Sequence, residues 1–235
     1  MQRNPIVTRD EWLAARKQHL KREKELTRQR DQLSAERRQL PWVRVEKPYV
    51  FDGPDGKETL ADLFGRRSQL IIQHFMFGPG WKEGCVGCSF GADHVDAARQ
   101  HFEHRDVAFV AVSRAPLSDI EPFKRRMGWR FKWVSSHSSD FNYDFNVSFT
   151  KDDEAKGKAF YNFELRDFES EEMSGISVFY KDGNGDIFHT YSTYARGDEF
   201  LSSAYMYLDL APKGRDEADL PYPSAWWRHH DKYED

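Results

Sequence analysis

Two apolar, strand-length runs on either side of a cysteine pair constrain this chain more than any other feature. Residues Gln69–Phe77 are almost all apolar, which is typical of a strand covered on both faces of its sheet. A loop then leads to Cys85-Val86-Gly87-Cys88, which opens a predicted helix ending near Glu103, and Val107–Val112 is a second buried strand. A strand, a helix and a second strand in this order form a parallel βαβ unit. The sequence therefore predicts an α/β fold with a mixed central sheet flanked by helices.

A long charged helix is predicted ahead of this unit. Thr8 followed by Glu11 is a capping box, and no Gly or Pro interrupts the chain from there to Pro41. One helix over residues 8–39, or two helices broken near the middle, fits this pattern. Its leucines recur seven apart, at positions 13 and 20 and again at 26, 33 and 40. This spacing favours a seam against one neighbour, which is either the chain's own domain or a second copy in a homodimer.

Shorter patterns predict the rest of the domain. The further elements expected, in chain order, are a strand pair over residues 43–51, a helical turn at 59–64, a helix at 116–127, a strand at 131–134, a hairpin at 175–191 and a final helix at 198–210. Residues 137–172 lack a regular pattern. Aromatic residues of the 137–195 region are candidates for the walls of a pocket over the cysteines: Phe141, Tyr143, Phe145, Tyr191 and Tyr194.

Three parts are therefore expected in the chain. Residues 1–40 form an N-terminal helical arm, residues 41–212 form the α/β domain, and residues 213–235 form an acidic, Trp-rich tail. In this tail, His229 and His230 are expected to be exposed to solvent.

Charge and composition exclude several classes of partner. Residues 1–40 carry 11 Lys and Arg against 6 Asp and Glu, whereas residues 151–235 carry 10 against 19. Because the basic stretch is interleaved with acidic residues and lacks stacking aromatics, we expect no nucleic-acid partner. No apolar run is long enough to span a membrane, and the first residues do not resemble a secretory signal, so no membrane partner is expected either. Two cysteines cannot form a disulfide scaffold, which predicts a cytoplasmic location, where thiols stay reduced.

The two cysteines carry the clearest chemical signal. They lie three apart, after a buried strand and at the start of a helix. The positive end of the helix favours the thiolate form of the first sulfur, and the second sulfur, one turn later, is placed to attack a mixed disulfide. This pattern predicts a thiol–disulfide oxidoreductase in which Cys85 is the nucleophile and Cys88 the resolving thiol. The substrate would be a protein or small-molecule thiol or disulfide.

Two other functions fit the same residues. The two thiolates with His189 could bind a soft ion such as copper, or zinc, although one cysteine pair supplies too few ligands for a structural zinc site and no cofactor is expected. Alternatively, the domain is a redox-inert scaffold whose long helix joins a partner. If the pair is catalytic, the candidate substrate-contacting residues are Trp81 in the preceding loop, Arg114 at the carboxyl end of a buried strand, and Ser177 in the predicted hairpin.

Several stretches also carry a resemblance to known proteins. The run from Thr59 to Cys88 looks like the opening of a thioredoxin-like domain, and residues 110–136 look like the matching part of the peroxiredoxin branch. More closely, five motifs resemble the bacterial DUF899 family of thioredoxin-like proteins. They are Leu40-Pro41-Trp42-Val43, Phe75-Met76-Phe77-Gly78, residues 112–116, residues 139–145 and residues 188–197. The resemblance implies a thioredoxin-like fold, and it implies no particular reaction because that family has no settled one.

The chain departs from the thioredoxin and peroxiredoxin patterns in two places. Thioredoxins carry a cis-proline facing the redox pair, which blocks metal capture and shapes the substrate groove, and the matching residues 173–177 contain no proline. This departure weakens the disulfide-exchange interpretation and favours metal binding. A peroxidatic cysteine needs Pro and Thr or Ser at fixed offsets before it. Those positions hold Gly78 and Lys82 before Cys85, and Trp81 and Cys85 before Cys88, which argues against a peroxiredoxin-type peroxidase.

Overall fold

The computed structural model describes residues 4–234, and the chain divides into two compact units, Met1–Pro41 and Trp42–Asp235. Among the described residues of the first unit, α1 (Arg9–Arg37) is one continuous helix. The predicted capping box is present: the N–H of Glu11 donates to Thr8 Oγ1 at 3.3 Å, and the N–H of Thr8 donates to the Glu11 carboxylate at 2.8 Å. No residue of α1 is buried. Side-chain pairs such as Arg16 with Glu23, at 2.7 Å, therefore stabilise the helix in place of a packed apolar face.

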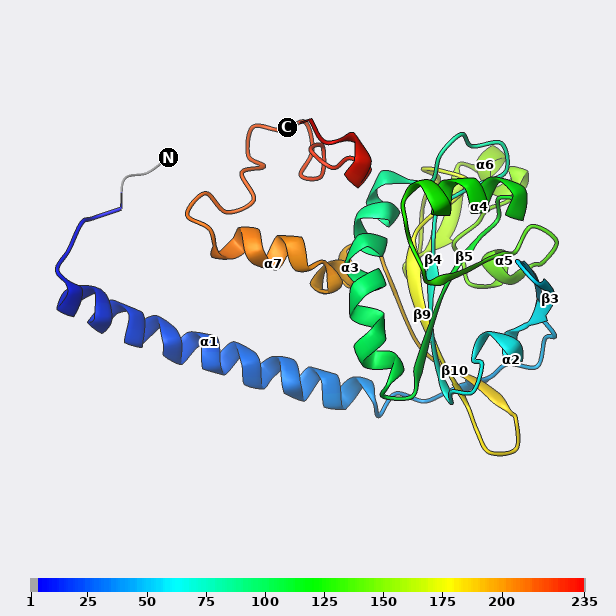
Figure 1. Cartoon of the computed structure of the whole chain (residues 1–235), viewed down its shortest axis with the longest axis horizontal. Helices are drawn as coiled ribbons and strands as arrows, with labels where there is room; N and C mark the ends of the chain where they lie inside the picture. The colour runs from blue at the N-terminus through cyan, green and yellow to red at the C-terminus, as the bar shows by residue number, and fades with distance from the viewer. Residues whose placement is uncertain (1–3, 235) are drawn as a thin grey trace. The chain divides into compact units, whose positions relative to one another are not determined.

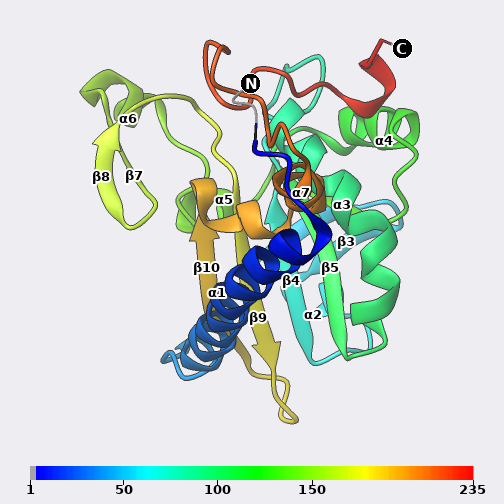
Figure 2. The ribbon, with the colours of Figure 1, turned by 90° about the vertical axis from the view of Figure 1, so that its left-hand side faces the viewer.

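The second unit is built on an eight-stranded mixed sheet (Figures 1 and 2). Its strand order is β1 (Val43–Arg44), β10 (Ile187–Tyr194), β9 (Gly175–Lys181), β4 (Gln69–His74), β5 (Val107–Ser113), β6 (Lys132–Ser135), β2 (Val50–Gly53) and β3 (Gly56–Thr59). Strands β4, β5 and β6 run parallel, and the β9–β10 hairpin lies antiparallel beside β4. This arrangement confirms the thioredoxin-like α/β fold that the sequence predicts.

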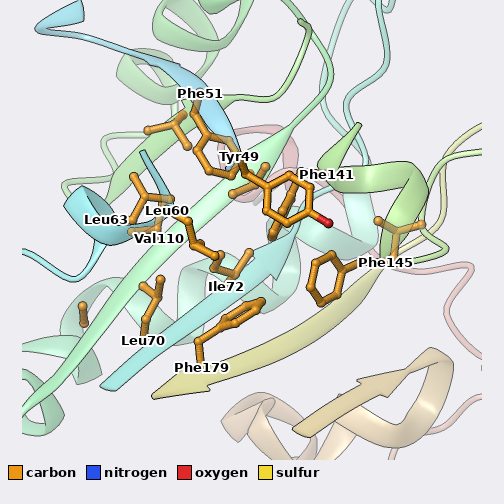
Figure 3. Close-up of a cluster of buried hydrophobic side chains, with 14 of the residues drawn as sticks. Tyr49, Phe51, Leu60, Leu63, Leu70, Ile72, Val110, Phe141, Phe145 and Phe179 are labelled. Atoms are coloured by element: carbon orange, nitrogen blue, oxygen red, sulfur yellow. The ribbon is translucent and has the colours of Figure 1, made fainter. Parts of the chain in front are cut away.

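Side chains of the central strands alternate between two apolar clusters, one on each face of the sheet. On one face, Phe75, Phe109 and Trp133 pack with residues of α3 (Val86–Glu103) and α4 (Leu117–Arg126). On the other face, Ile72 and Val110 belong to a cluster completed by α2 (Leu60–Leu63), α5 (Phe141–Asp144) and the segment after α5, which Figure 3 shows. Helix α3 connects β4 to β5, so the fold places the start of α3 at the carboxyl end of β4.

The remaining elements differ in part from the sequence-based expectations. Residues 137–172 contain α5, α6 (Lys151–Lys156) and a small hairpin of β7 (Lys158–Tyr161) and β8 (Glu164–Asp167). The predicted strand pair over residues 43–51 is wrong, because β1 pairs with β10 and β2 pairs with β3 and β6.

The predicted final helix is two elements. A 3-10 helix, η1 (Ala195–Leu201), is followed by α7 (Ser203–Leu210), and the extended backbone of the buried Ser202 separates them. A last 3-10 turn, η2 (His230–Lys232), closes the C-terminal segment. Among residues 4–234, no helix has both the length and the apolar character needed to cross a membrane.

Candidate functional site

Both cysteines lie at the N-terminus of α3, where the loop after β4 folds back on the strand. Cys85 is the N-cap residue, with an extended backbone (φ −54°, ψ 133°), and its N–H donates to the carbonyl oxygen of Met76 at 2.9 Å. The N–H of Met76 in turn donates to Cys88 Sγ at 3.3 Å. Both thiols are free, with Cys85 partly exposed and Cys88 buried. The loop and the helix start therefore hold the two sulfurs in fixed positions.

Local hydrogen bonding gives the two thiols opposite acidities. The pKa of Cys85 is lowered to about 6, mainly because the Cys88 thiol donates to its sulfur, with further help from the N–H groups of Cys88 and Gly87. The pKa of Cys88 is raised, because this hydrogen bond favours its protonated form and because it is buried beside the negative charge of Cys85. At neutral pH, Cys85 is therefore the thiolate and Cys88 the thiol.

A cavity of about 540 Å³ lies beside the pair, and both cysteines line it. The walls are formed by Gly87, Phe90, Gly91 and Val95 of α3, by Gln73 and His74 at the end of β4, by Ser174, Gly175 and Ile176 at the start of β9, by Ala195, Arg196, Asp198, Glu199 and Leu201 of η1, and by Ser202, Tyr205, Arg215, Glu217, Pro223, Ser224 and Trp227. Ser174 and Gly175 occupy the stretch in which thioredoxins would carry their proline.

An aromatic residue of the C-terminal segment, which begins at residue 213, forms one wall of this cavity. The ring of Trp227 stacks on Phe90, with centroids 4.6 Å apart and planes 12° from parallel. Trp227 also lies against Gly87, between the two cysteines, where an added Cβ would come within 2.9 Å of the indole ring. Sequence analysis did not identify Trp227. The one local signal was the glycine inside the C-x-x-C, which leaves room for a large side chain from elsewhere.

The C-terminal segment is also anchored to the loop that precedes Cys85. His229 is buried, at 3% exposed, and its Nε2 lies 2.9 Å from the carbonyl oxygen of Gly84. Lys232 pairs with Glu83 at 2.8 Å. The expectation that both tail histidines are exposed is therefore wrong for His229 and correct for His230. Figure 1 shows this segment, in red, beside the N-terminal end of α3.

Asp198 is the second residue of the site that sequence analysis missed. It lies on η1, lines the cavity, and has a pKa raised to about 6, mainly by burial and further by the charge of Glu199. Its own charge contributes to the raised pKa of Cys88. No basic side chain among residues 4–234 forms an ion pair with it. Asp198 is therefore a carboxyl group near the thiols that changes its charge near neutral pH.

The three candidate substrate-contacting residues lie apart from the lining of the cavity. Ser177 is fully buried, and its Oγ is hydrogen-bonded to His74 Nε2 at 2.7 Å. Arg114 forms an ion pair with the buried Glu172 at 2.5 Å. Trp81 is partly buried against the cluster that contains Cys88. The structure does not bring these three side chains together, and their contact with substrate stays a prediction.

The aromatic residues expected over the cysteines lie elsewhere. Phe141, Phe145 and Tyr194 belong to the cluster on the opposite face of the sheet from Cys88, and neither Tyr143 nor Tyr191 lines the cavity. That expectation is wrong because Phe141 of α5 and Phe145, the residue after it, pack on His74 of β4 and Phe179 of β9. The walls of the cavity come instead from the end of β4, from α3, from the start of β9 and from residues between 195 and 227.

His189, the candidate third metal ligand, also lies away from the cysteines. Its Nε2 is 2.7 Å from Ser192 Oγ, and its ring packs on Phe145 and Phe179 in the cluster on the other face. Within the described part of the chain, no three His, Cys, Asp or Glu side chains are grouped so that they could hold a metal ion. The ligand set of Cys85, Cys88 and His189 is therefore not assembled in this structure.

Comparison with known proteins gives one family match and several similar folds. A family model described as "Bacterial protein of unknown function (DUF899)" matches residues 1–233. Peroxiredoxin Q from Xanthomonas campestris is 13% identical, with 72% of this chain and 98% of that chain covered and a TM-score of 0.48. Peroxidoxin BcpB from Mycobacterium tuberculosis is 12% identical, with 70% of this chain and 94% of that chain covered and a TM-score of 0.46. A putative thiol:disulfide interchange protein DsbE from Chlorobium tepidum is 14% identical, with 72% of this chain and 97% of that chain covered and a TM-score of 0.41. No curated protein matches the sequence.

Proposed function

The chain belongs to the DUF899 family of bacterial proteins, and from that premise we propose that it is a thiol–disulfide oxidoreductase whose reacting pair is Cys85 and Cys88. One observation carries the proposal: a free thiol with a pKa of about 6 lies one helical turn from a second, protonated thiol, and both line one cavity. A thiol with this pKa is about nine-tenths thiolate at pH 7, whereas an ordinary cysteine is only a few per cent thiolate. The thiolate is the form that attacks disulfides.

The exchange takes place in two steps. The Cys85 thiolate attacks one sulfur of a substrate disulfide, forms a mixed disulfide with it, and expels the other sulfur as a thiolate that takes a proton from water. Cys88 then loses its proton, attacks the sulfur of Cys85 and releases the second half of the substrate. Two electrons pass from the protein dithiol to the substrate, which leaves as two thiols. A dithiol reductant returns the Cys85–Cys88 disulfide to the starting state.

The second step needs a base, because Cys88 holds its proton tightly. We assign this role to Asp198, which lines the same cavity and interacts electrostatically with Cys88. Its pKa of about 6 makes it mostly ionised at neutral pH and able to accept a proton when the mixed disulfide has formed. Once protonated, it can return the proton to the departing thiolate.

Redox titration of the cysteine pair tests the proposed function. The protein would be equilibrated in thiol buffers of defined potential, trapped by alkylation, and the masses of the Cys85 and Cys88 peptide measured. We expect reversible conversion between dithiol and disulfide within about −120 to −270 mV, the span of known exchange proteins. Cys85→Ser and Cys88→Ser should each abolish it. Two thiols that stay free over the whole range, or that react only after a chelator is added, would contradict the proposal.

A further inference from the structure

We propose that the substrate is a low-molecular-weight disulfide with amide-type arms, and that the cavity beside the cysteines admits it while keeping protein disulfides out. This inference rests on the proposed exchange function and adds the class of molecule that reaches Cys85. Three observations support it: a cover over the pair, the anchoring of that cover, and two buried polar atoms without partners.

The cover is formed by the C-terminal segment, which lies across the start of α3. The Trp227 ring contacts Gly87, the residue between the cysteines, and stacks on Phe90 in the next turn. The side chain of His229 reaches the carbonyl oxygen of Gly84, immediately before Cys85. A disulfide on a folded protein needs open backbone around the attacking sulfur. Here side chains of the C-terminal segment contact the backbone on both sides of Cys85, and Cys85 itself lines the cavity.

The cover is held by several charged contacts. Lys232 and Arg126 both donate to the carboxylate of Glu83, in the loop before the pair. Arg126 also pairs with Asp231 at 2.8 Å. A network of ion pairs therefore joins the C-terminal segment to the loop before Cys85 and to α4. These contacts fix the segment against the site, where it forms part of the wall.

Three buried polar atoms on residues of the cavity wall have no hydrogen-bond partner among residues 4–234. One is Nδ1 of His74, at the end of β4. The other two, on which the inference rests, are the carbonyl oxygen Oε1 of Gln73, a side chain only 7% exposed, and the indole Nε1 of Trp227. The amide nitrogen of Gln73 donates to the carbonyl oxygen of Cys88 at 3.1 Å, which leaves Oε1 as the free acceptor. Buried polar groups are normally paired.

Amide groups on a ligand have the chemistry to satisfy both atoms. An amide carries a donor for the Gln73 oxygen and an acceptor for the Trp227 N–H, and it needs no charge to do so. The cavity volume of about 540 Å³ lies within the range of small-molecule sites, roughly 300 to 1,000 Å³. Disulfides of short peptides and of capped amino acids carry such amides close to their sulfur atoms. An apolar disulfide would leave both protein atoms unpaired.

Steady-state reduction of three disulfides tests this inference. The probes are capped cystine, with an acetyl group and a methylamide on each half, diethyl disulfide, which lacks polar arms, and the disulfides of insulin. For the natural sequence we expect kcat/KM for capped cystine to exceed that for either other probe by about tenfold or more. Trp227→Phe keeps a ring but removes the N–H. It should lower the preference for capped cystine over diethyl disulfide by about fivefold to tenfold.

Two further variants complete the design. Trp227→Ala removes the ring that covers Gly87, so reduction of insulin should rise severalfold while reduction of capped cystine falls. Tyr222→Ala is the matched control, because this aromatic residue lies in the same segment, is 61% exposed and does not line the cavity. It should leave all three rates unchanged.

The redox titration separates the two possible failures. If the cysteine pair titrates reversibly but insulin is reduced as fast as capped cystine, or Trp227→Phe leaves the preference unchanged, the substrate inference is overturned and the exchange function stands. If the pair does not titrate, the exchange function is contradicted, and so is the substrate inference that rests on it.

Discussion

At the scale of single residues, the acidity of Cys85 is set by groups within one turn of helix. The hydrogen bond from the Cys88 thiol is the largest influence, and the N–H groups of Cys88 and Gly87 add to it. Burial of the thiol raises the pKa of Cys85 and so opposes these hydrogen bonds. The difference between the two thiols is therefore a property of the C-x-x-C turn itself, and it can be altered by changing Cys88 alone.

The alkylation rate of Cys85 should report this hydrogen bond. In the natural sequence, we expect the rate constant for iodoacetamide to reach half its maximum near pH 6, because only the thiolate reacts. Cys88→Ala removes the donor and should move this midpoint toward the ordinary cysteine range, about pH 8.5. Cys88→Ser keeps a hydroxyl donor at nearly the same position, so its midpoint should lie between those of the natural sequence and of Cys88→Ala. Equal midpoints for all three proteins would show that the Cys88 thiol has no part in the shift.

The buried carboxyl of Asp198 should cost stability at neutral and alkaline pH. Its pKa in the folded protein is about 6, above the ordinary value of 3.8, so the fold favours the protonated form. The cost is absent well below pH 4, appears as the pH rises from about 4 to 6, and is complete above that range. Asp198→Asn should therefore raise the free energy of unfolding at pH 8 by up to about 3 kcal/mol and change it little at pH 4. Urea unfolding at both pH values measures this, and Asp209→Asn, whose pKa is lowered, is the contrasting variant.

The same substitution should slow the second step of exchange. Without the Asp198 carboxylate, the Cys88 thiol loses the base assigned to it, so the mixed disulfide on Cys85 should accumulate in a single turnover. We expect the resolution rate to fall by about tenfold to a hundredfold, and in the natural sequence to fall as the pH drops below about 6. Rapid acid quenching followed by mass spectrometry measures the mixed disulfide. Unchanged resolution would remove Asp198 from the mechanism.

At the scale of elements, the C-terminal segment and the loop before α3 depend on each other. His229→Ala removes a buried hydrogen bond to Gly84 and the packing of the imidazole on the Phe123 ring. We expect it to lower the free energy of unfolding by about 2 kcal/mol, measured by urea unfolding, and to speed the reaction of Cys85 with a bulky maleimide. Tyr222, in the same segment and 61% exposed, is the control, and Tyr222→Ala should cost less than about 0.5 kcal/mol. If both variants behaved alike, the buried contact would not hold the segment in place.

Sequence patterns predicted those elements whose cause is local. The apolar run Gln69–Phe77 and the capping box at Thr8 depend on neighbouring residues, and both β4 and α1 lie where expected. The pairing of β1 with β10 joins residues about 145 positions apart, and no local pattern encodes it. The same holds for the candidate site. The cysteines were identified from spacing, whereas Trp227 belongs to a polar tail whose composition predicts exposure, and its burial arises from contact with Gly87.

At the scale of the whole molecule, both apolar clusters belong to the unit Trp42–Asp235. Helix α1 contributes no buried residue, and Leu13, Leu20, Leu26 and Leu33 are each at least 38% exposed. A 29-residue helix with an exposed leucine seam is typical of a segment that pairs with a second helix. A homodimer formed through this helix stays a prediction, and packing of the helix on the chain's own domain is the alternative that the leucine spacing leaves open.

Deletion of residues 1–38 tests the roles of both units. We expect the shortened chain to keep the thermal midpoint and the Cys85 alkylation profile of the full chain, because both clusters and the cavity remain intact. Its mass by analytical ultracentrifugation should change from that of a dimer to that of a monomer. An unchanged association state would refute pairing through α1, and loss of the thermal transition would show that the domain needs the helix to fold.

The position of Trp227 near the end of the chain also sets an order of events during protein synthesis. Cys85 is translated about 140 residues before the tryptophan that covers it. At synthesis rates of about 5–20 residues per second, that interval is about 7 to 28 seconds. During this time the strands beside the cysteines can already pair, but the last wall of the cavity does not yet exist. A nascent chain thus exposes its thiols to any disulfide nearby, and selection among substrates begins only once Trp227 has been synthesised.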